Sequence, residues 1–118
     1  MAFGTPGGDV QTQAMLQVWL NMDVFGMDPQ TAVEAPRFAT FSFPNSFEPH
    51  TYQPARLTLE ARIDEKVGKG LSERGHDLEW WPPYTWRAGG VCLVKRHGQN
   101  GVLEGAADPR RSSYALGW

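Results

Sequence analysis

A double-glycine turn followed at once by a long helical pattern opens the chain and limits what it can fold into. The turn is Gly4-Thr5-Pro6-Gly7-Gly8-Asp9, and the helix is predicted over residues 10–25. Two adjacent glycines let the main chain turn with N–H groups pointing outward, and the helix N-terminus beside them adds positive potential. This pattern is typical of a backbone anion site such as an oxyanion hole. A strand-to-helix turn that needs positive φ at one or both glycines is the structural alternative.

Length, charge and composition exclude several classes of protein. With 118 residues the chain forms one domain at most, which would bury about two thirds of its unfolded surface. Thirteen acidic and eleven basic side chains provide no polycationic face, so nucleic acid is not an expected partner. No apolar stretch has the length of a membrane span. The 41% hydrophobic content, with 5 tryptophans, exceeds what one small core hides and favours a partner chain.

Two further helices are predicted besides the first. In residues 10–25 an i, i+4 stripe is widened by other apolar residues, so we expect this helix to be mostly buried, with Asp9 as its N-cap. A short helix begins at Asp28-Pro29 and ends before Pro36. A surface helix near residues 63–74 is weakened by two glycines. The apolar residues that widen the first stripe are Leu16, Trp19, Leu20 and Val24, and the two glycines are Gly68 and Gly70.

The remaining segments predict strands and turns. Residues 1–3 are expected to be the end of a buried strand. Residues 56–60 alternate between apolar and polar side chains, which predicts a half-buried strand, and residues 78–81 are predicted to form a third strand. Residues 90–95 and 102–104 predict an antiparallel hairpin across a turn with Asn100-Gly101. The aromatic segment 37–54 is irregular, with at most one short strand. The fold class is therefore α+β, with sheet and helix in layers.

Most other candidate groups favour structural roles. Cys92 lies in an apolar run and is expected to be a buried thiol rather than a nucleophile. The histidines are too far apart in sequence for a metal-ligand pattern, so neither a metal nor a cofactor is predicted. Two pairs of acidic residues are interpreted as solvent-exposed surface charges rather than as a general acid and base. The histidines are His50, His76 and His97, and the acidic pairs are Asp64-Glu65 and Asp77 with Glu79.

Three features near the C-terminus leave alternatives open. The aromatic and proline cluster of residues 80–86 favours core packing and a rigid turn over an interface or pocket lining. Gly89-Gly90 is either a second backbone site or a turn into the hairpin. Arg110, after Asp108-Pro109, is expected to form an ion pair within that turn.

The order of these motifs resembles the C-terminal part of the small subunit of γ-glutamyltransferases, which belong to the N-terminal nucleophile hydrolases. The resemblance covers essentially the whole chain, and four segments carry it. They are the glycine turn with Gln11-Thr12-Gln13, residues 16–21, the run from Asp28-Pro29-Gln30 through Ala35-Pro36-Arg37-Phe38, and Gly105 through Asp108-Pro109-Arg110.

The resemblance implies a specific chemistry. In such enzymes an N-terminal threonine attacks the γ-glutamyl amide with its own amine as base, and backbone N–H groups hold the tetrahedral oxyanion. It assigns that last role to Gly7 and Gly8. It also implies that residues 1–118 are a single partial domain, a piece of the family's αββα sandwich of antiparallel strands with packed helices.

The catalytic parts of such an enzyme would lie upstream of Met1, because every threonine of this chain is internal and lacks a free amine. We therefore expect a C-terminal fragment that is inactive alone. Its expected partner is the upstream, nucleophile-bearing part with the large subunit, and a γ-glutamyl compound is the parent enzyme's substrate. The isolated chain is expected to self-associate through uncovered sheet edges. An acylase of another amide on the same scaffold, and a binding or oligomerisation module using residues 80–86, are the alternatives.

Overall fold

The computed structural model describes residues 1–117 and contains two three-stranded sheets. In the first sheet, β1 (Ala2–Gly4), β5 (Cys92–Arg96) and β6 (Leu103–Ala107) are antiparallel, in the order β1-β5-β6. In the second, β3 (Arg56–Glu60) pairs antiparallel with β2 (Phe38–Thr40) and parallel with β4 (Asp77–Trp81). The α+β prediction is confirmed, and so is the β5–β6 hairpin.

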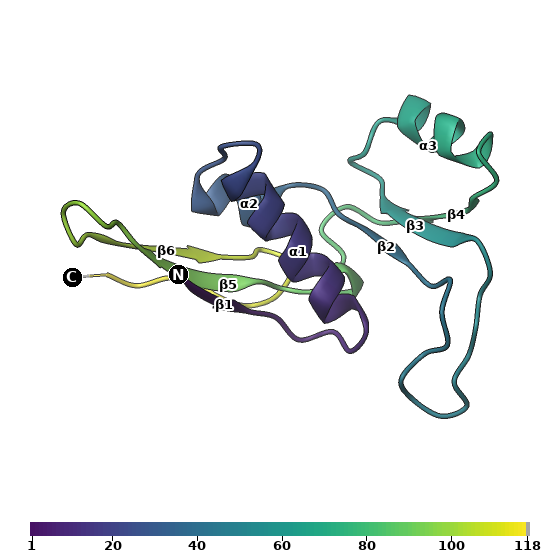
Figure 1. Ribbon diagram of the computed structural model, residues 1–118, viewed down its shortest axis with the longest axis horizontal. Helices are drawn as coiled ribbons and strands as arrows, with labels where there is room; N and C mark the ends of the chain where they lie inside the picture. Colours follow the sequence, from purple (N-terminus) through teal and green to yellow (C-terminus); the bar gives the residue numbers. More distant parts are fainter. Residues whose placement is uncertain (118) are drawn as a thin grey trace.

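The helices are distributed over both sheets (Figure 1). Helices α1 (Val10–Asp23) and α2 (Pro29–Glu34) lie beside the first sheet, and α3 (Glu65–Ser72) lies on the second. A short 3-10 helix, η1 (Trp86–Ala88), leads back from the second sheet to β5. None of the helices within residues 1–117 has the length and apolarity needed to cross a membrane.

Helix α1 buries one stripe and leaves its other apolar residues uncovered. Its buried residues are those of the predicted stripe: Val10, Ala14, Val18 and Met22. The prediction of a mostly buried helix is wrong, because Leu16 is 54% exposed and Trp19 is 39% exposed. Val24, just beyond the helix, is also exposed. The described part of the chain covers only one face of α1.

Two glutamines of α1 attach the helix to the edge of the second sheet. The Gln13 side chain donates to the carbonyl of Thr40 at 3.1 Å and accepts from the Thr40 N–H at 2.8 Å. Gln17 makes the same pair of bonds with Phe38, at 2.9 and 3.1 Å. These amides satisfy backbone groups of β2 that no strand within residues 1–117 pairs. Helix α1 therefore connects the two sheets.

Helix α3 contacts its sheet through a glycine. A Cβ placed on Gly68 would lie 2.5 Å from Cζ2 of Trp80, so the helix packs on the indole where no side chain fits. The predicted surface helix is confirmed, and Val67 of the expected stripe is exposed. Gly68, predicted only to weaken the helix, permits this close packing.

Two predictions of strand burial are wrong. Strand β1 is largely exposed, with only Phe3 partly covered, because no strand among residues 1–117 pairs with its outer edge. Strand β3 is buried on both faces rather than one, since α3 packs over one face of its sheet and the segments of Arg37 and Arg110 bind Glu60 on the other. Its polar face includes Thr58 and Glu60, both with no exposed surface.

A buried cluster of four charged side chains, here called the ionic centre, connects the two sheets. Its members are Arg37, Glu60, Asp108 and Arg110. The expected pair of Arg110 with Asp108 is confirmed at 3.0 Å. Arg110 also reaches Glu60 at 2.5 Å, and Arg37 reaches Asp108 at 2.6 Å. Opposite charges thus alternate through the cluster, and its Arg donors also bond the carbonyls of Val33, Ala35 and Ala88.

The two arginines of the ionic centre respond differently to their surroundings. Burial lowers the pKa of Arg37, and the neighbouring charge of Arg110 lowers it further. Burial also acts to lower the pKa of Arg110, but its hydrogen bonds to Glu60 and the charge of Asp108 outweigh this, so its pKa is raised. A guanidinium stays protonated in either case. Both arginines of the cluster are therefore permanent positive charges.

Candidate functional site

The glycine turn has free backbone donors immediately before α1. Gly7 has φ +138° and Gly8 has φ +57°, so the positive φ that the structural alternative requires at one or both glycines occurs at both. Their carbonyls accept the first bonds of the helix, from Val10 at 3.1 Å and Gln11 at 3.0 Å. Within residues 1–117, the N–H groups of Gly7 and Gly8 have no hydrogen-bond acceptor. Two donors thus remain available at the positive end of a helix dipole.

Asp9 does not cap α1 with its side chain, and the N-cap prediction is wrong in this respect. Its carboxylate instead accepts from the N–H of Ser46 at 2.8 Å and from the Ser46 hydroxyl at 2.5 Å. These bonds lower the pKa of Asp9 below its ordinary value of 3.8. The negative charge is therefore held by the loop between β2 and β3, and not by the N–H groups of the turn.

The second glycine pair is a turn, and its N–H groups are used internally. The Gly89 N–H donates to the carbonyl of Trp86 at 3.2 Å, and the Gly90 N–H donates to Oγ1 of Thr5 at 2.7 Å. A second backbone anion site at Gly89-Gly90 is therefore excluded. The pair instead attaches the segment before β5 to the first glycine turn.

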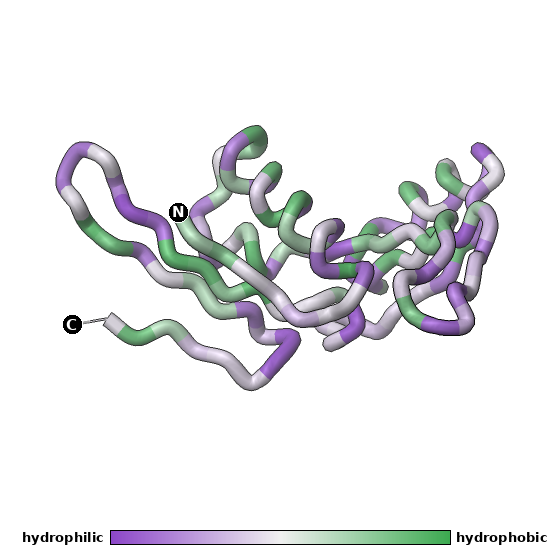
Figure 2. Tube along the Cα trace, turned by 60° about the horizontal axis from the view of Figure 1, so that its bottom comes forward, coloured by the Kyte–Doolittle hydropathy of each residue, from purple (hydrophilic) through white to green (hydrophobic). Residues whose placement is uncertain are grey.

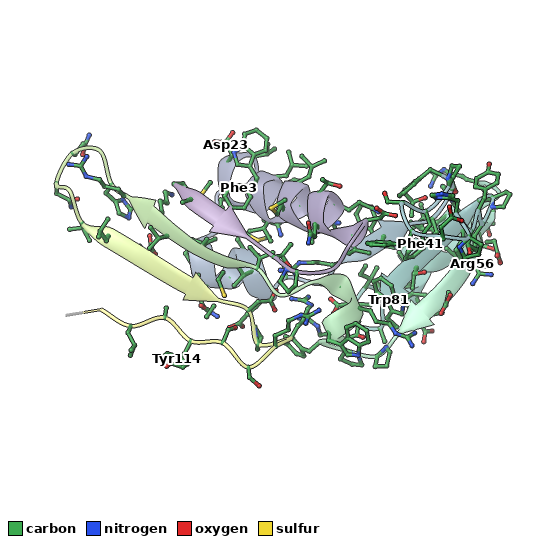
Figure 3. All side chains as sticks on the ribbon, turned by 90° about the horizontal axis from the view of Figure 1, so that it is seen from below. Phe3, Asp23, Phe41, Arg56, Trp81 and Tyr114 are labelled. Carbon is green, nitrogen blue, oxygen red and sulfur yellow. The ribbon has the colours of Figure 1, made fainter. Side chains whose placement is uncertain are left out.

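Two hollows meet at the glycine turn. A pocket of about 410 Å³ has Gly7, Phe41, Trp81, Trp86 and Arg87 among its lining residues. A second pocket of about 170 Å³ is lined by Gly7, Gly8 and aromatic residues of the β2–β3 loop. Figure 3 shows Phe41 and Trp81 close together, and their rings meet edge to face with centroids 6.2 Å apart. A group bound at Gly7 would have space for a substituent beside it.

One polar atom of the larger pocket is unsatisfied. Thr58 is fully buried, and its Oγ1 has no hydrogen-bond partner among the described residues. Alternation along β3 and β4 places Thr58 on the same sheet face as Glu79 and Trp81, opposite the face that α3 covers. Thr58 is not among the site residues predicted from the sequence, although the strict alternation of residues 56–60 indicates its orientation.

The aromatic cluster of residues 80–86 is divided between core and pocket. Trp81 is buried, which confirms core packing for that residue. Trp86 is 62% exposed and lines the larger pocket, as the alternative predicted. Tyr84 lies under the guanidinium of Arg62, which is 3.7 Å from the ring centroid.

The remaining candidates lie apart from the turn. Cys92 is exposed, so the expectation of a buried thiol is wrong: β5 turns Leu93 toward the core and Cys92 to the other face. Asp77 and Glu79 both pair with Arg56, at 2.8 and 2.7 Å. Asp64 caps α3 through the Lys66 N–H. His97 contacts Glu104, and His50 contacts Glu48. No cluster of three potential metal ligands occurs in the described part of the chain.

Comparison with known proteins identifies the family. The family model described as Gamma-glutamyltranspeptidase matches residues 1–118. The chain belongs to the gamma-glutamyltranspeptidase family. The resemblance stated from the sequence motifs is thereby confirmed.

The relatives of this gamma-glutamyltranspeptidase family chain are named after different activities. It is 30% identical over 116 residues to the glutathione hydrolase-like YwrD proenzyme of Bacillus subtilis, covering 98% of this chain and 21% of that protein. It is also 30% identical over 120 residues to the oxamate amidohydrolase proenzyme of Klebsiella pneumoniae, covering 100% of this chain and 21% of that protein. The chain thus spans about a fifth of the length of these relatives.

A solved structure supports the same assignment of the fold. Cephalosporin acylase from Bacillus halodurans matches with a TM-score of 0.82 and 28% identity, over 98% of this chain and 19% of that chain. The expected N-terminal nucleophile hydrolase fold of this family member is confirmed.

Proposed function

We propose that residues 1–118 form the C-terminal portion of the small subunit of a γ-glutamyltransferase-like enzyme, and that the N–H groups of Gly7 and Gly8 hold the oxyanion during amide cleavage. The observation that carries this proposal is the pair of unsatisfied N–H donors at positive-φ glycines, at the start of α1 and beside a pocket. The Asp9 carboxylate, which would compete with an anion, is held by Ser46.

In the proposed reaction, this chain stabilises negative charge and another segment supplies the nucleophile. A threonine hydroxyl attacks the carbonyl carbon of the γ-glutamyl amide, and the carbonyl oxygen becomes a tetrahedral oxyanion. Donors already fixed in place stabilise the negatively charged oxygen of the intermediate more strongly than they stabilise the oxygen of the planar carbonyl. This difference lowers the activation barrier. The threonine's own amine takes the hydroxyl proton and passes it to the amide nitrogen, the C–N bond breaks and the amine leaves, so that the acyl group is held as a threonine ester. Water or an acceptor amine then attacks this ester and releases the threonine hydroxyl.

The proposed partner is the upstream part of the same enzyme, which contains the nucleophile and the large subunit. The outer edge of β1 pairs with no strand in residues 1–117, and an unpaired edge of this kind accepts another strand. Exposed apolar residues lie on the same half of the molecule, where Figure 2 shows apolar stretches along the β5–β6 hairpin and the C-terminal segment. They are Val94, Val102, Leu103, Tyr114 and Leu116. We expect the isolated chain to self-associate through this surface.

Two alternative functions have their own support. Cleavage of an amide other than a γ-glutamyl amide is favoured by relatives named as an oxamate amidohydrolase and a cephalosporin acylase. A non-catalytic binding module is favoured by the exposed Trp86 beside Arg87 at the larger pocket.

The test compares the purified 118-residue chain with the same chain assembled with its upstream part. Each preparation is given a γ-glutamyl anilide, oxamate and a cephalosporin-type amide. We expect no hydrolysis by the chain alone and γ-glutamyl hydrolysis by the assembly. Preferential turnover of another amide supports the acylase alternative. Activity of the chain alone, or an inactive assembly with a correctly formed N-terminal threonine, contradicts the proposal.

A further inference from the structure

The segment Ala88–Val91 is held rigidly by the ionic centre. The Ala88 carbonyl accepts from Nη1 of Arg37 at 2.9 Å, and the Val91 N–H donates to Oδ2 of Asp108 at 3.0 Å. Arg37 and Asp108 are themselves paired at 2.6 Å. Ala88 and Val91 are buried, with 1% and 0% of their surface exposed. Two fixed charges thus hold both ends of this segment.

Thr5 transmits that fixed position to the glycine turn. Its Oγ1 accepts from the Gly90 N–H at 2.7 Å and donates to the Pro6 carbonyl at 2.8 Å. The approach is close, since a Cβ on Gly89 would lie 2.8 Å from this oxygen and 3.3 Å from Cβ of Ala14. One hydroxyl therefore joins the segment 88–91 to the turn.

The Pro6 carbonyl is in the same peptide unit as the Gly7 N–H. A peptide unit is planar and trans, so fixing the direction of its C=O also fixes the direction of its N–H. A hydrogen bond accepted by the carbonyl also polarises the unit and strengthens its N–H as a donor. The Thr5 hydroxyl thus acts directly on one of the two proposed oxyanion donors.

We propose that Thr5 is a positioning residue that aims the Gly7 N–H at the oxyanion, with the Arg37–Asp108 pair as its fixed support. This inference rests on the proposed function of Gly7 and Gly8. It extends that function by naming the side chain that orients the backbone donor. Thr5 itself makes no contact with substrate in this role.

The experiment compares three variants in the assembled enzyme. Thr5→Val keeps the shape and removes the hydroxyl, Thr5→Ser keeps the hydroxyl, and Thr12→Val makes the same change at an exposed residue of α1. We expect Thr5→Val to lower kcat about 10- to 100-fold while KM changes by less than about 3-fold, because misplaced donors weaken transition-state binding. Thr5→Ser and Thr12→Val should each keep kcat within about 3-fold of the parent enzyme.

Several outcomes overturn the inference: a Thr5→Val kcat equal to that of Thr12→Val, a loss confined to KM, or no rescue by Thr5→Ser. Thr5→Ala replaces Thr5→Val if the valine variant does not fold.

Amide exchange in the unsubstituted 118-residue chain is an independent test, because Gly90 should be protected and an unprotected Gly90 N–H contradicts the hydrogen bond to Thr5. If both Thr5→Val and Gly8→Ala leave kcat unchanged, the proposed oxyanion site is wrong. If Thr5→Val leaves kcat unchanged but Gly8→Ala lowers it, only the positioning role of Thr5 is wrong.

Discussion

The Asp9 carboxylate accepts both hydrogen bonds that Ser46 can donate to it, from its N–H at 2.8 Å and from its hydroxyl at 2.5 Å. Ser46 lies in the long loop between β2 and β3, which Figure 1 shows extending away from the sheets. The contact attaches this loop to the glycine turn, next to the pocket that the loop and the turn share. One ionised side chain therefore hydrogen-bonds the loop wall of the proposed site to the turn.

The first prediction concerns the pKa of Asp9. Because the hydroxyl and N–H of Ser46 lower this pKa below 3.8, Ser46→Ala should raise it toward 3.8. The contact stabilises the loop above the unfolded-state pKa and is lost as pH falls through the lower folded-state pKa. Carboxyl titration by NMR measures the change. Ser42→Ala, in the same loop, is the control, and the pKa of Asp28, lowered by Thr31, should not move.

A second prediction compares the ionic centre with a surface ion pair. Arg110→Met leaves the buried carboxylates of Glu60 and Asp108 undercompensated, and should lower the free energy of unfolding by about 3–5 kcal/mol. Arg56→Met breaks the pairs with Asp77 and Glu79 and should destabilise the fold far less, because solvent screens these charges. Urea unfolding of both variants measures the difference. Equal losses would contradict the greater importance of the buried charges of the ionic centre.

A third prediction uses the two glycines of α3. Gly68→Ala places a methyl group 2.5 Å from Trp80, and should destabilise the fold by about 1–3 kcal/mol. The Cβ of Gly70→Ala meets only the flexible end of Arg74, at 3.7 Å, and should stabilise the helix by up to about 1 kcal/mol. Thermal unfolding distinguishes them. A stabilised Gly68→Ala variant would contradict the close packing of α3 on the indole.

Local patterns in the sequence predicted most of the helices and strands. The start of α2 at Asp28-Pro29 and the hairpin turn at Asn100-Gly101 are set by residues that are neighbours in the sequence, so they could be predicted. The structure confirms both. The parallel pairing of β3 with β4 was not predicted, although a strand, a helix and a strand in succession favour a parallel crossover.

The contacts that shape the site join residues far apart in the chain, and local rules do not predict them. Asp9 fits an N-cap by position, but Ser46 offers its carboxylate two donors and the side chain binds there. The ionic centre draws Arg37, Glu60 and Arg110 from three separate segments, and only the pair within one turn was predicted. Positive φ at Gly7 and Gly8 was predicted because it is a local property of the glycines.

The most direct measurement of the central claim is kcat of the assembled enzyme with Gly8→Ala, compared with Gly26→Ala. Both glycines have positive φ, +57° and +68°, so an added Cβ strains the backbone at either position. At Gly8 it also lies 3.0 Å from Cε2 of Phe47, so the ring or the turn must shift, whereas nothing lies within 4 Å at Gly26. We predict that Gly8→Ala, which keeps the N–H but misplaces it, lowers kcat about 10- to 100-fold, and that Gly26→Ala lowers it less than about 3-fold. Equal kcat values for the two variants would contradict an oxyanion site at this turn.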